Sequence, residues 1–144
     1  MTESHSILLV DSDDDTRRSL AHRLRQRGCH ILEADGLEGA RQLANRRRLD
    51  VALVDLDSLE SAGLHVVRAL RSQRPSCRII VLVSPGKTTL SIKAMRLGAF
   101  DDQTHPVDVE LLLSRIRRAL AAKRPARRRA PAAGGNDSAA GQVG

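Results

Sequence analysis

The stretch that decides the fold is residues 50–55, Asp50-Val51-Ala52-Leu53-Val54-Asp55, an apolar run that ends in a carboxylate. A run this short, set between segments of helical period, is typical of a buried central strand of a parallel sheet. A second run, Ile7-Leu8-Leu9-Val10, ends in the same way in Asp11. Parallel strands end at one edge of a sheet, so we expect Asp11 and Asp55 to lie together there. Open α/β sheets bind their ligands at that edge.

Strand-like and helix-like segments alternate along the rest of the chain. The strand-like segments are residues 6–10, 30–33, 51–54, 78–83 and 100–103. The helical segments are residues 14–27, 37–46, a segment around Leu64 to Leu70 that stops before Pro75, residues 87–97, and a last helix whose apolar stripe begins at Val109 and which runs to about Ala122. This alternation predicts a parallel sheet with helices on both faces.

Composition and charge narrow the class of protein. The chain has 144 residues, no Trp or Tyr and one Phe, so its core must be aliphatic and stacking on nucleic-acid bases is not expected. We expect residues 1–5 to be a short extension, residues 6–122 one domain, and residues 123–144 a disordered basic tail rich in Ala and Gly. No segment approaches a membrane span and the N-terminus is not signal-like, which predicts a cytoplasmic protein. Cys29 and Cys77 have no metal-ligand spacing, and we expect two thiols rather than a disulfide.

Five segments in order carry a resemblance to a known family. They are Ile7–Asp11, Asp50–Asp55, Ile79–Ser84, Gly98–Asp102 and His105-Pro106. With them, residues 6–122 resemble the receiver domain of bacterial two-component response regulators. The resemblance implies a flavodoxin-like (CheY-like) doubly wound sheet of five parallel strands in the order 2-1-3-4-5, with helices on both faces.

The resemblance also implies a phosphoryl-transfer site. Asp55 falls on the position that accepts a phosphoryl group from a sensor histidine kinase. Mg²⁺ would be held by Asp11, Asp55 and the backbone carbonyl of Asp57, together with the residue at position 12. Such transfer depends mostly on positioning and on neutralising the charge that develops on the phosphoryl group.

Several positions depart from the family pattern. Ser12 replaces the acidic metal ligand, and a hydroxyl is a poor substitute for a carboxylate on a hard cation. Val83 replaces the Thr or Ser that bonds the phosphoryl group, and Ser84 should point to the other face. His105 replaces a Lys, and Asp102 replaces the switch aromatic. We therefore expect an atypical or pseudo-receiver with weak Mg²⁺ binding and little or no phosphorylation.

Simpler interpretations stay open for some of these residues. Asp55 could merely begin a loop, and His105 could be a surface loop histidine. Asp13, with the two acids after it, could start a helix or could stand in for Ser12. Arg46–Arg48 and Arg127–Arg129 could be solvated charge or could bind an anionic partner. The sequence has no Gly-rich phosphate loop, nucleophile elbow or His-Cys metal cluster, so we do not expect an enzyme.

The resulting prediction is a receiver that signals by protein-protein interaction. Its partner would be a sensor histidine kinase or another signalling protein, and a homodimer is the other candidate. The contact face would be the fourth helix, fifth strand and fifth helix of the family, made basic by Lys87, Lys93, Arg96, Arg115 and Arg118. The alternative is a basic adaptor that binds nucleic acid through its Arg-rich tail.

Overall fold

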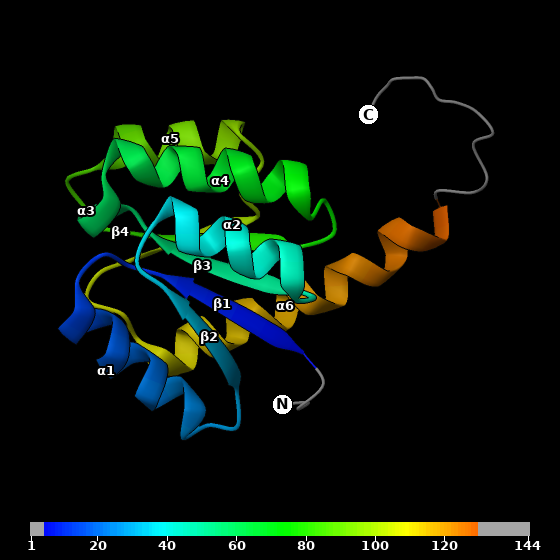
Figure 1. Ribbon diagram of the computed structural model, residues 1–144, viewed down its shortest axis with the longest axis horizontal. Helices are drawn as coiled ribbons and strands as arrows, with labels where there is room; N and C mark the ends of the chain where they lie inside the picture. The colour runs from blue at the N-terminus through cyan, green and yellow to red at the C-terminus, as the bar shows by residue number, and fades with distance from the viewer. Residues whose placement is uncertain (1–4, 130–144) are drawn as a thin grey trace.

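A parallel sheet of five strands forms the centre of the computed structural model, which describes residues 5–129, with side chains described up to Ala122 (Figure 1). The strands are β1 (Ser6–Val10), β2 (His30–Ala34), β3 (Val51–Asp55), β4 (Arg78–Val83) and β5 (Asp101–Thr104). Their order is β2-β1-β3-β4-β5, which confirms the predicted order. Val10 pairs with Val54 across β1 and β3, so Asp11, the residue after β1, and Asp55, the last residue of β3, lie at the same edge of the sheet.

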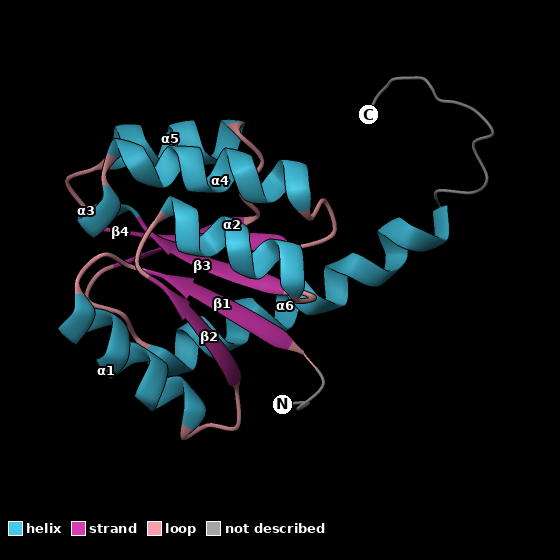
Figure 2. Cartoon of the chain, in the orientation of Figure 1, coloured by secondary structure: helices cyan, strands magenta, loops and turns pink. Residues whose placement is uncertain are grey.

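The helices cover both faces of this sheet (Figure 2). They are α1 (Asp14–Arg25), α2 (Leu37–Arg46), α3 (Leu56–Leu59), α4 (Ser61–Gln73), α5 (Thr88–Arg96) and α6 (Val109–Arg129). Helices α2, α4 and α5 pack on one face, and α1 and α6 pack on the other. The short helix α3, which the sequence did not suggest, begins directly after Asp55.

The core divides into two aliphatic clusters, one on each face of the sheet. Alternate residues of each strand enter opposite clusters: Leu8 and Val54 face α2, α4 and α5, whereas Leu9 and Leu53 face α1 and α6. Every residue of β3 is buried, as a central strand covered on both faces requires. Cys29 and Cys77 are both buried thiols in the described part of the chain, so no disulfide joins them.

Some element boundaries differ from the predicted ones. Strand β5 begins at Asp101, one residue later than predicted. Phe100 packs against the second cluster, and its ring contacts the guanidinium of Arg78. Helix α6 continues beyond Ala122 to Arg129 despite Pro125, and the other residues of this stretch, Ala, Lys and Arg, are good helix formers. The backbone of residues 123–129 is therefore helical where disorder was expected. The rest of the predicted tail, residues 130–144, lies outside the described residues, as do residues 1–4. No helix of the described chain is long and apolar enough to span a membrane.

The turn after α5 depends on Gly98. This residue has φ +109°, a conformation that L side chains rarely adopt, and a Cβ there would lie 2.6 Å from Nε of Arg71. Gly98→Ala should therefore lower the free energy of unfolding by about 1–3 kcal/mol. Gly86→Ala is the control, because a Cβ on that exposed residue meets no atom within 4 Å. Urea denaturation of both variants tests this, and equal stability of the two would contradict the assigned conformation.

Candidate functional site

Two buried carboxylates lie at the carboxyl edge of the sheet. Asp11 follows β1 and is 1% exposed, and Asp55 ends β3 and is 3% exposed. Oδ1 of Asp11 accepts the N–H of Asp13 at 2.9 Å. Oδ1 of Asp55 accepts the N–H of Asp57 at 2.9 Å and of Ser58 at 3.1 Å, and so caps the N-terminus of α3. The loop-initiating role considered for Asp55 is thus present, but it uses only one of the two oxygens.

The second oxygen of Asp55 faces His105. Nε2 of His105 lies 3.0 Å from Oδ2 of Asp55 and 3.8 Å from Oδ2 of Asp57. His105 comes from the loop after β5, and its side chain is 23% exposed. The fold therefore brings His105 to the acidic edge, where the sequence left open whether it was only a surface histidine.

The side chain of Asp57 also belongs to this site, although sequence analysis assigned only its backbone carbonyl. Oδ1 of Asp57 accepts the N–H of Ser84 at 2.9 Å, and the hydroxyl of Ser84 donates to Oδ2. The expectation that Ser84 points to the other face is wrong. Strand β4 ends at Val83, and the alternation of a strand does not extend into the loop that follows. Val83 is buried in the apolar cluster and offers no donor.

The two carboxyl groups next to His105 have opposite pKa shifts. Burial, followed by the charge of Asp11, raises the pKa of Asp55 above the ordinary value. Burial also acts to raise the pKa of Asp57, but the two hydrogen bonds from Ser84 lower the pKa overall. Asp57 is therefore the more readily ionised of the two carboxyl groups.

Ser12 and Asp13 have different partners: Ser12 bonds to Ser58 on α3, and Asp13 caps α1. The hydroxyl of Ser12 donates to the carbonyl of Ser58 at 3.1 Å, and the N–H of Ser12 donates to Oγ of Ser58 at 3.0 Å. Asp13 caps α1 by accepting the N–H of Thr16, a bond that lowers the pKa of Asp13. The interpretation of Asp13 as a helix start is therefore the one that the geometry favours.

These groups surround an open pocket of about 330 Å³ at the sheet edge. The lining residues are Asp11, Asp13, Thr16, Asp55, Asp57, Ser58 and His105. Asp102 is elsewhere: its Oδ2 accepts the hydroxyl of Ser91 on α5 at 2.5 Å, in a half-buried position between β5 and α5. Sequence analysis missed Ser58 and Ser91 and assigned Ser84 the wrong direction, because a Ser in a loop or on a helix carries no pattern that reveals its partner.

Comparison with known proteins identifies the class that this fold and site define. Residues 7–117 match the model of the response regulator receiver domain, so the chain belongs to that family. Photosynthetic apparatus regulatory protein RegA of Cereibacter sphaeroides is 36% identical over 103 residues, which are 72% of this chain and 56% of RegA. The chain thus spans little more than half the length of this curated relative.

Solved structures show the same fold. The receiver domain of NtrX from Brucella abortus has a TM-score of 0.74 at 25% identity, covering 80% of this chain and 98% of that one. A CheY-like receiver domain protein from Methanospirillum hungatei has a TM-score of 0.76 at 21% identity, covering 84% of this chain and 97% of that one. Receiver domains are signalling modules of two-component systems, and they interact with histidine kinases and other signalling proteins.

Receiver domains bind Mg²⁺ at an acidic pocket, and the residues of this chain fit that ion only in part. Mg²⁺ demands a near-octahedral set of oxygen ligands. Asp11, Asp55 and Asp57 supply oxygens, but the hydroxyl of Ser12 is already bonded to the carbonyl of Ser58. An imidazole nitrogen lies beside the carboxylates instead of a further oxygen.

The raised pKa of Asp55 has a consequence for stability. The folded protein holds a proton on Asp55 more tightly than the unfolded chain does, so stability is lost as the pH rises through the pKa of the folded state. Asp55→Asn removes this loss and should raise the melting temperature by about a few degrees at pH 7. The gain should shrink as the pH falls below the ordinary carboxyl pKa.

The matched control for that variant is Asp13→Asn. The pKa of Asp13 is lowered, so its ionisation favours the folded state at neutral pH, and Asn is an equally good N-terminal cap. Asp13→Asn should therefore not stabilise the protein. Thermal unfolding between pH 3 and about pH 8 measures both variants. A drop in melting temperature for Asp55→Asn at pH 7 would show that its contact with His105 outweighs the cost of burying its charge.

Proposed function

We propose that this chain is an atypical receiver, in which Asp55 occupies the phosphoacceptor position but accepts a phosphoryl group slowly or not at all. The observation that carries this proposal is the contact between Oδ2 of Asp55 and Nε2 of His105 at 3.0 Å. Oδ1 is bonded to two backbone N–H groups, so Oδ2 is the oxygen left to react, and a histidine engages it. Signalling would then depend on a protein surface in the cytoplasm more than on phosphorylation.

The surroundings of Asp55 support this proposal. Phosphoryl transfer needs cations and hydrogen-bond donors around the transferred group. The side chain of Val83 supplies no donor, and Ser12 supplies no carboxylate for Mg²⁺, which should bind weakly. The imidazole of His105 carries a charge only when protonated, whereas a Lys would be a fixed cation.

The connection from this site to α5 also differs from that of a switching receiver. Asp102 stands at the switch position, and its carboxylate is bonded to Ser91 on α5. Moving a carboxylate out of such a bond into an apolar slot costs desolvation. A ligand shifts an equilibrium only if it interacts differently with the two states, and here the groups that would supply the difference are replaced. We expect one dominant conformation.

Restoring the family residues should restore phosphorylation. In the triple variant Ser12→Asp, Val83→Thr, His105→Lys, Asp55 should be labelled by a small phosphodonor at least about tenfold faster than in the wild type, because a metal ligand, a donor and a fixed cation return. Intact-protein mass spectrometry with Mg²⁺ measures the rate. The same triple variant with Asp55→Ala is the control and should not be labelled. Rapid labelling of the wild type at submillimolar Mg²⁺ would contradict the proposal.

The positive surface that we propose for a partner is shifted from the face that the sequence suggested. Arg115 lies 2.9 Å and Arg118 3.9 Å from Oδ2 of Asp101, so the carboxylate of Asp101 offsets one of these two positive charges. Lys93 and Arg96 on α5 have no acidic group within 4 Å among the residues with described side chains. They line a pocket of about 330 Å³ with Arg68 and His65 of α4. Uncompensated positive charge therefore lies over α4 and α5.

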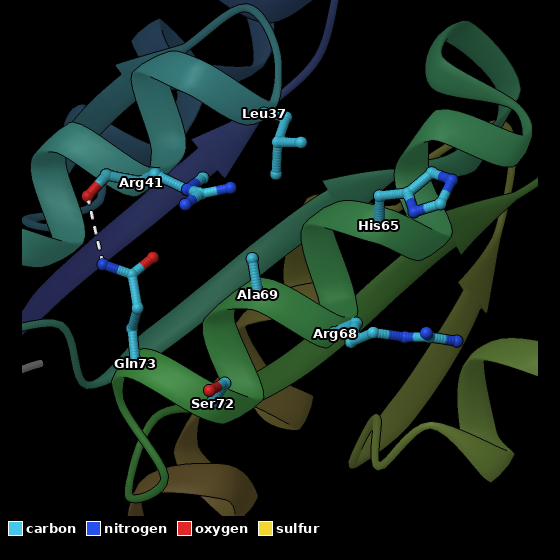
Figure 3. Close-up of a pocket in the computed structure, with 7 residues that line it drawn as sticks. All are labelled: Leu37, Arg41, His65, Arg68, Ala69, Ser72 and Gln73. Atoms are coloured by element: carbon cyan, nitrogen blue, oxygen red, sulfur yellow. Dashed lines mark hydrogen bonds between the residues drawn. The ribbon is translucent and has the colours of Figure 1, made fainter.

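A second groove extends this positive surface to α2. Its volume is about 330 Å³, and it lies between α2 and α4. Arg41 reaches over it from α2, and one face of α4 forms the other wall, with His65, Arg68, Ala69 and Ser72 (Figure 3). Helices α4 and α5 contain no Asp or Glu. We propose that an acidic surface of a kinase or another signalling protein binds here, with a homodimer through α5, β5 and α6 as the alternative.

Charge reversal tests this surface. Lys93→Glu with Arg96→Glu should weaken binding of the signalling partner about tenfold, mainly through a slower association rate, because surface charge steers encounter. Arg18→Glu with Arg23→Glu, on exposed positions of α1 in the other layer, is the matched control and should have little effect. Asp55→Ala should leave binding nearly unchanged. If Asp55→Ala abolishes binding while the fold survives, the domain is a working phospho-switch.

A further inference from the structure

Three groups that can ligate a metal converge in the pocket at the sheet edge. They are the carboxylates of Asp55 and Asp57 and the imidazole of His105, and one ligand atom from each lies within 4.8 Å of the other two. They come from the end of β3, from α3 and from the loop after β5. A carboxylate-carboxylate-imidazole set is a different donor set from the all-oxygen site that Mg²⁺ prefers.

We propose that this pocket binds a divalent ion of the first transition row, such as Zn²⁺, in preference to Mg²⁺, through the side chains of Asp55, Asp57 and His105. The inference deepens the proposed function by naming the ion of the same pocket. It rests on that function only for the location of the site, and it does not require Asp55 to accept a phosphoryl group.

The spacing of the ligand atoms suits such an ion. With bonds of about 2.0–2.2 Å, two ligands lie about 3.0 Å apart at octahedral angles and about 3.4 Å apart at tetrahedral angles. Nε2 of His105 is 3.0 Å from Oδ2 of Asp55 and 3.8 Å from Oδ2 of Asp57. A shift of His105 toward Asp57 by a few tenths of an ångström brings both pairs into this range, and the His105 side chain is partly exposed.

The chemistry of the donors favours the same class of ion. Imidazole suits Zn²⁺ and its neighbours, whereas Mg²⁺ gives up its waters reluctantly and prefers oxygen. Ser12 removes a hard oxygen ligand from the pocket, and His105 adds a nitrogen. The same two sequence changes thus weaken the site for Mg²⁺ and strengthen it for a transition metal.

Hydrogen bonds hold the two carboxylates in place. Oδ1 of Asp55 is fixed by the N–H groups of Asp57 and Ser58, which leaves Oδ2 directed at His105. The N–H and hydroxyl of Ser84 hold the carboxylate of Asp57. Metal-binding carboxylates are usually supported by such outer contacts. The open pocket leaves room for water to complete the coordination.

Metal titration of the full chain, without an affinity tag and without phosphodonor, tests the proposal. Co²⁺ binding is followed by visible absorption, and Zn²⁺ affinity is measured by competition with a chromophoric chelator. We expect one ion per chain, with Zn²⁺ bound at least about a hundredfold more tightly than Mg²⁺. His105→Asn and His105→Lys should each weaken Zn²⁺ binding at least about tenfold and change Mg²⁺ binding much less. Asp57→Asn should also weaken Zn²⁺ binding.

The controls are histidines outside the pocket. His30→Ala and His65→Ala, both exposed, should bind Zn²⁺ as the wild type does. Circular dichroism shows whether each variant is folded. If His105→Lys does not fold, His105→Asn alone is used as the test variant. The proposal would be overturned if a folded His105→Asn protein kept the wild-type Zn²⁺ affinity, or if His65→Ala lost Zn²⁺ affinity equally. It would also be overturned if the wild type bound Zn²⁺ more weakly than Mg²⁺. If the wild type is phosphorylated rapidly at Asp55 and also binds Zn²⁺ through His105, only the proposed function is overturned.

Discussion

Two carboxylates buried side by side form the constraint on which the rest of the site depends. Asp11 and Asp55 end adjacent parallel strands, and the pairing of Val10 with Val54 places them together. Two negative charges close together in a poorly solvated place cost free energy. Burial and the charge of Asp11 therefore raise the pKa of Asp55. The backbone reduces this cost by directing N–H groups at one oxygen of each carboxylate. What remains is one oxygen of Asp55 that needs a positive or donating partner, and His105 is the partner that this chain provides.

A histidine in place of a lysine changes the charge of the site and its ability to bind a metal. A Lys in this place would be a permanent point charge on a flexible stem. An imidazole is planar, its charge depends on its proton, and its nitrogen can ligate a metal once the proton has left. The charge balance of the pocket in this chain therefore depends on what binds there. The lowered pKa of Asp57, which the Ser84 hydrogen bonds cause against the effect of burial, adds a second ionised group beside the same imidazole. Asp55, Asp57 and His105 act as one electrostatic unit.

The sheet and its helix layers could be predicted because their signal is repeated along the chain. Short apolar runs end in acids, and Gly28 and Gly98 follow helices with positive φ, so the parallel sheet and the meeting of Asp11 with Asp55 followed from the pattern. The strand order was what the resemblance to the family implied. The contacts of Ser84 could not be predicted, because the alternation that fixes side-chain direction stops where β4 stops. The ion pair of Arg115 with Asp101 could not be predicted from the sequence either, because it depends on how α6 packs against β5. Charge counted along the sequence therefore overestimated the positive charge on that face.

The link from pocket to surface in this chain runs through different atoms from those that the family pattern suggests. Val83 ends β4 inside the apolar cluster and forms no side-chain hydrogen bond to Asp55. Ser84 instead binds Asp57 with both its N–H and its hydroxyl, and it begins the short segment that leads into α5. Ser84 thus joins Asp57 to the segment that precedes the helix carrying Lys93 and Arg96. Asp102 holds the far side of α5 through Ser91, so the helix is tied at two polar points. Asp57, whose side chain the family pattern leaves without a role, is therefore the polar link between the pocket and the segment before α5.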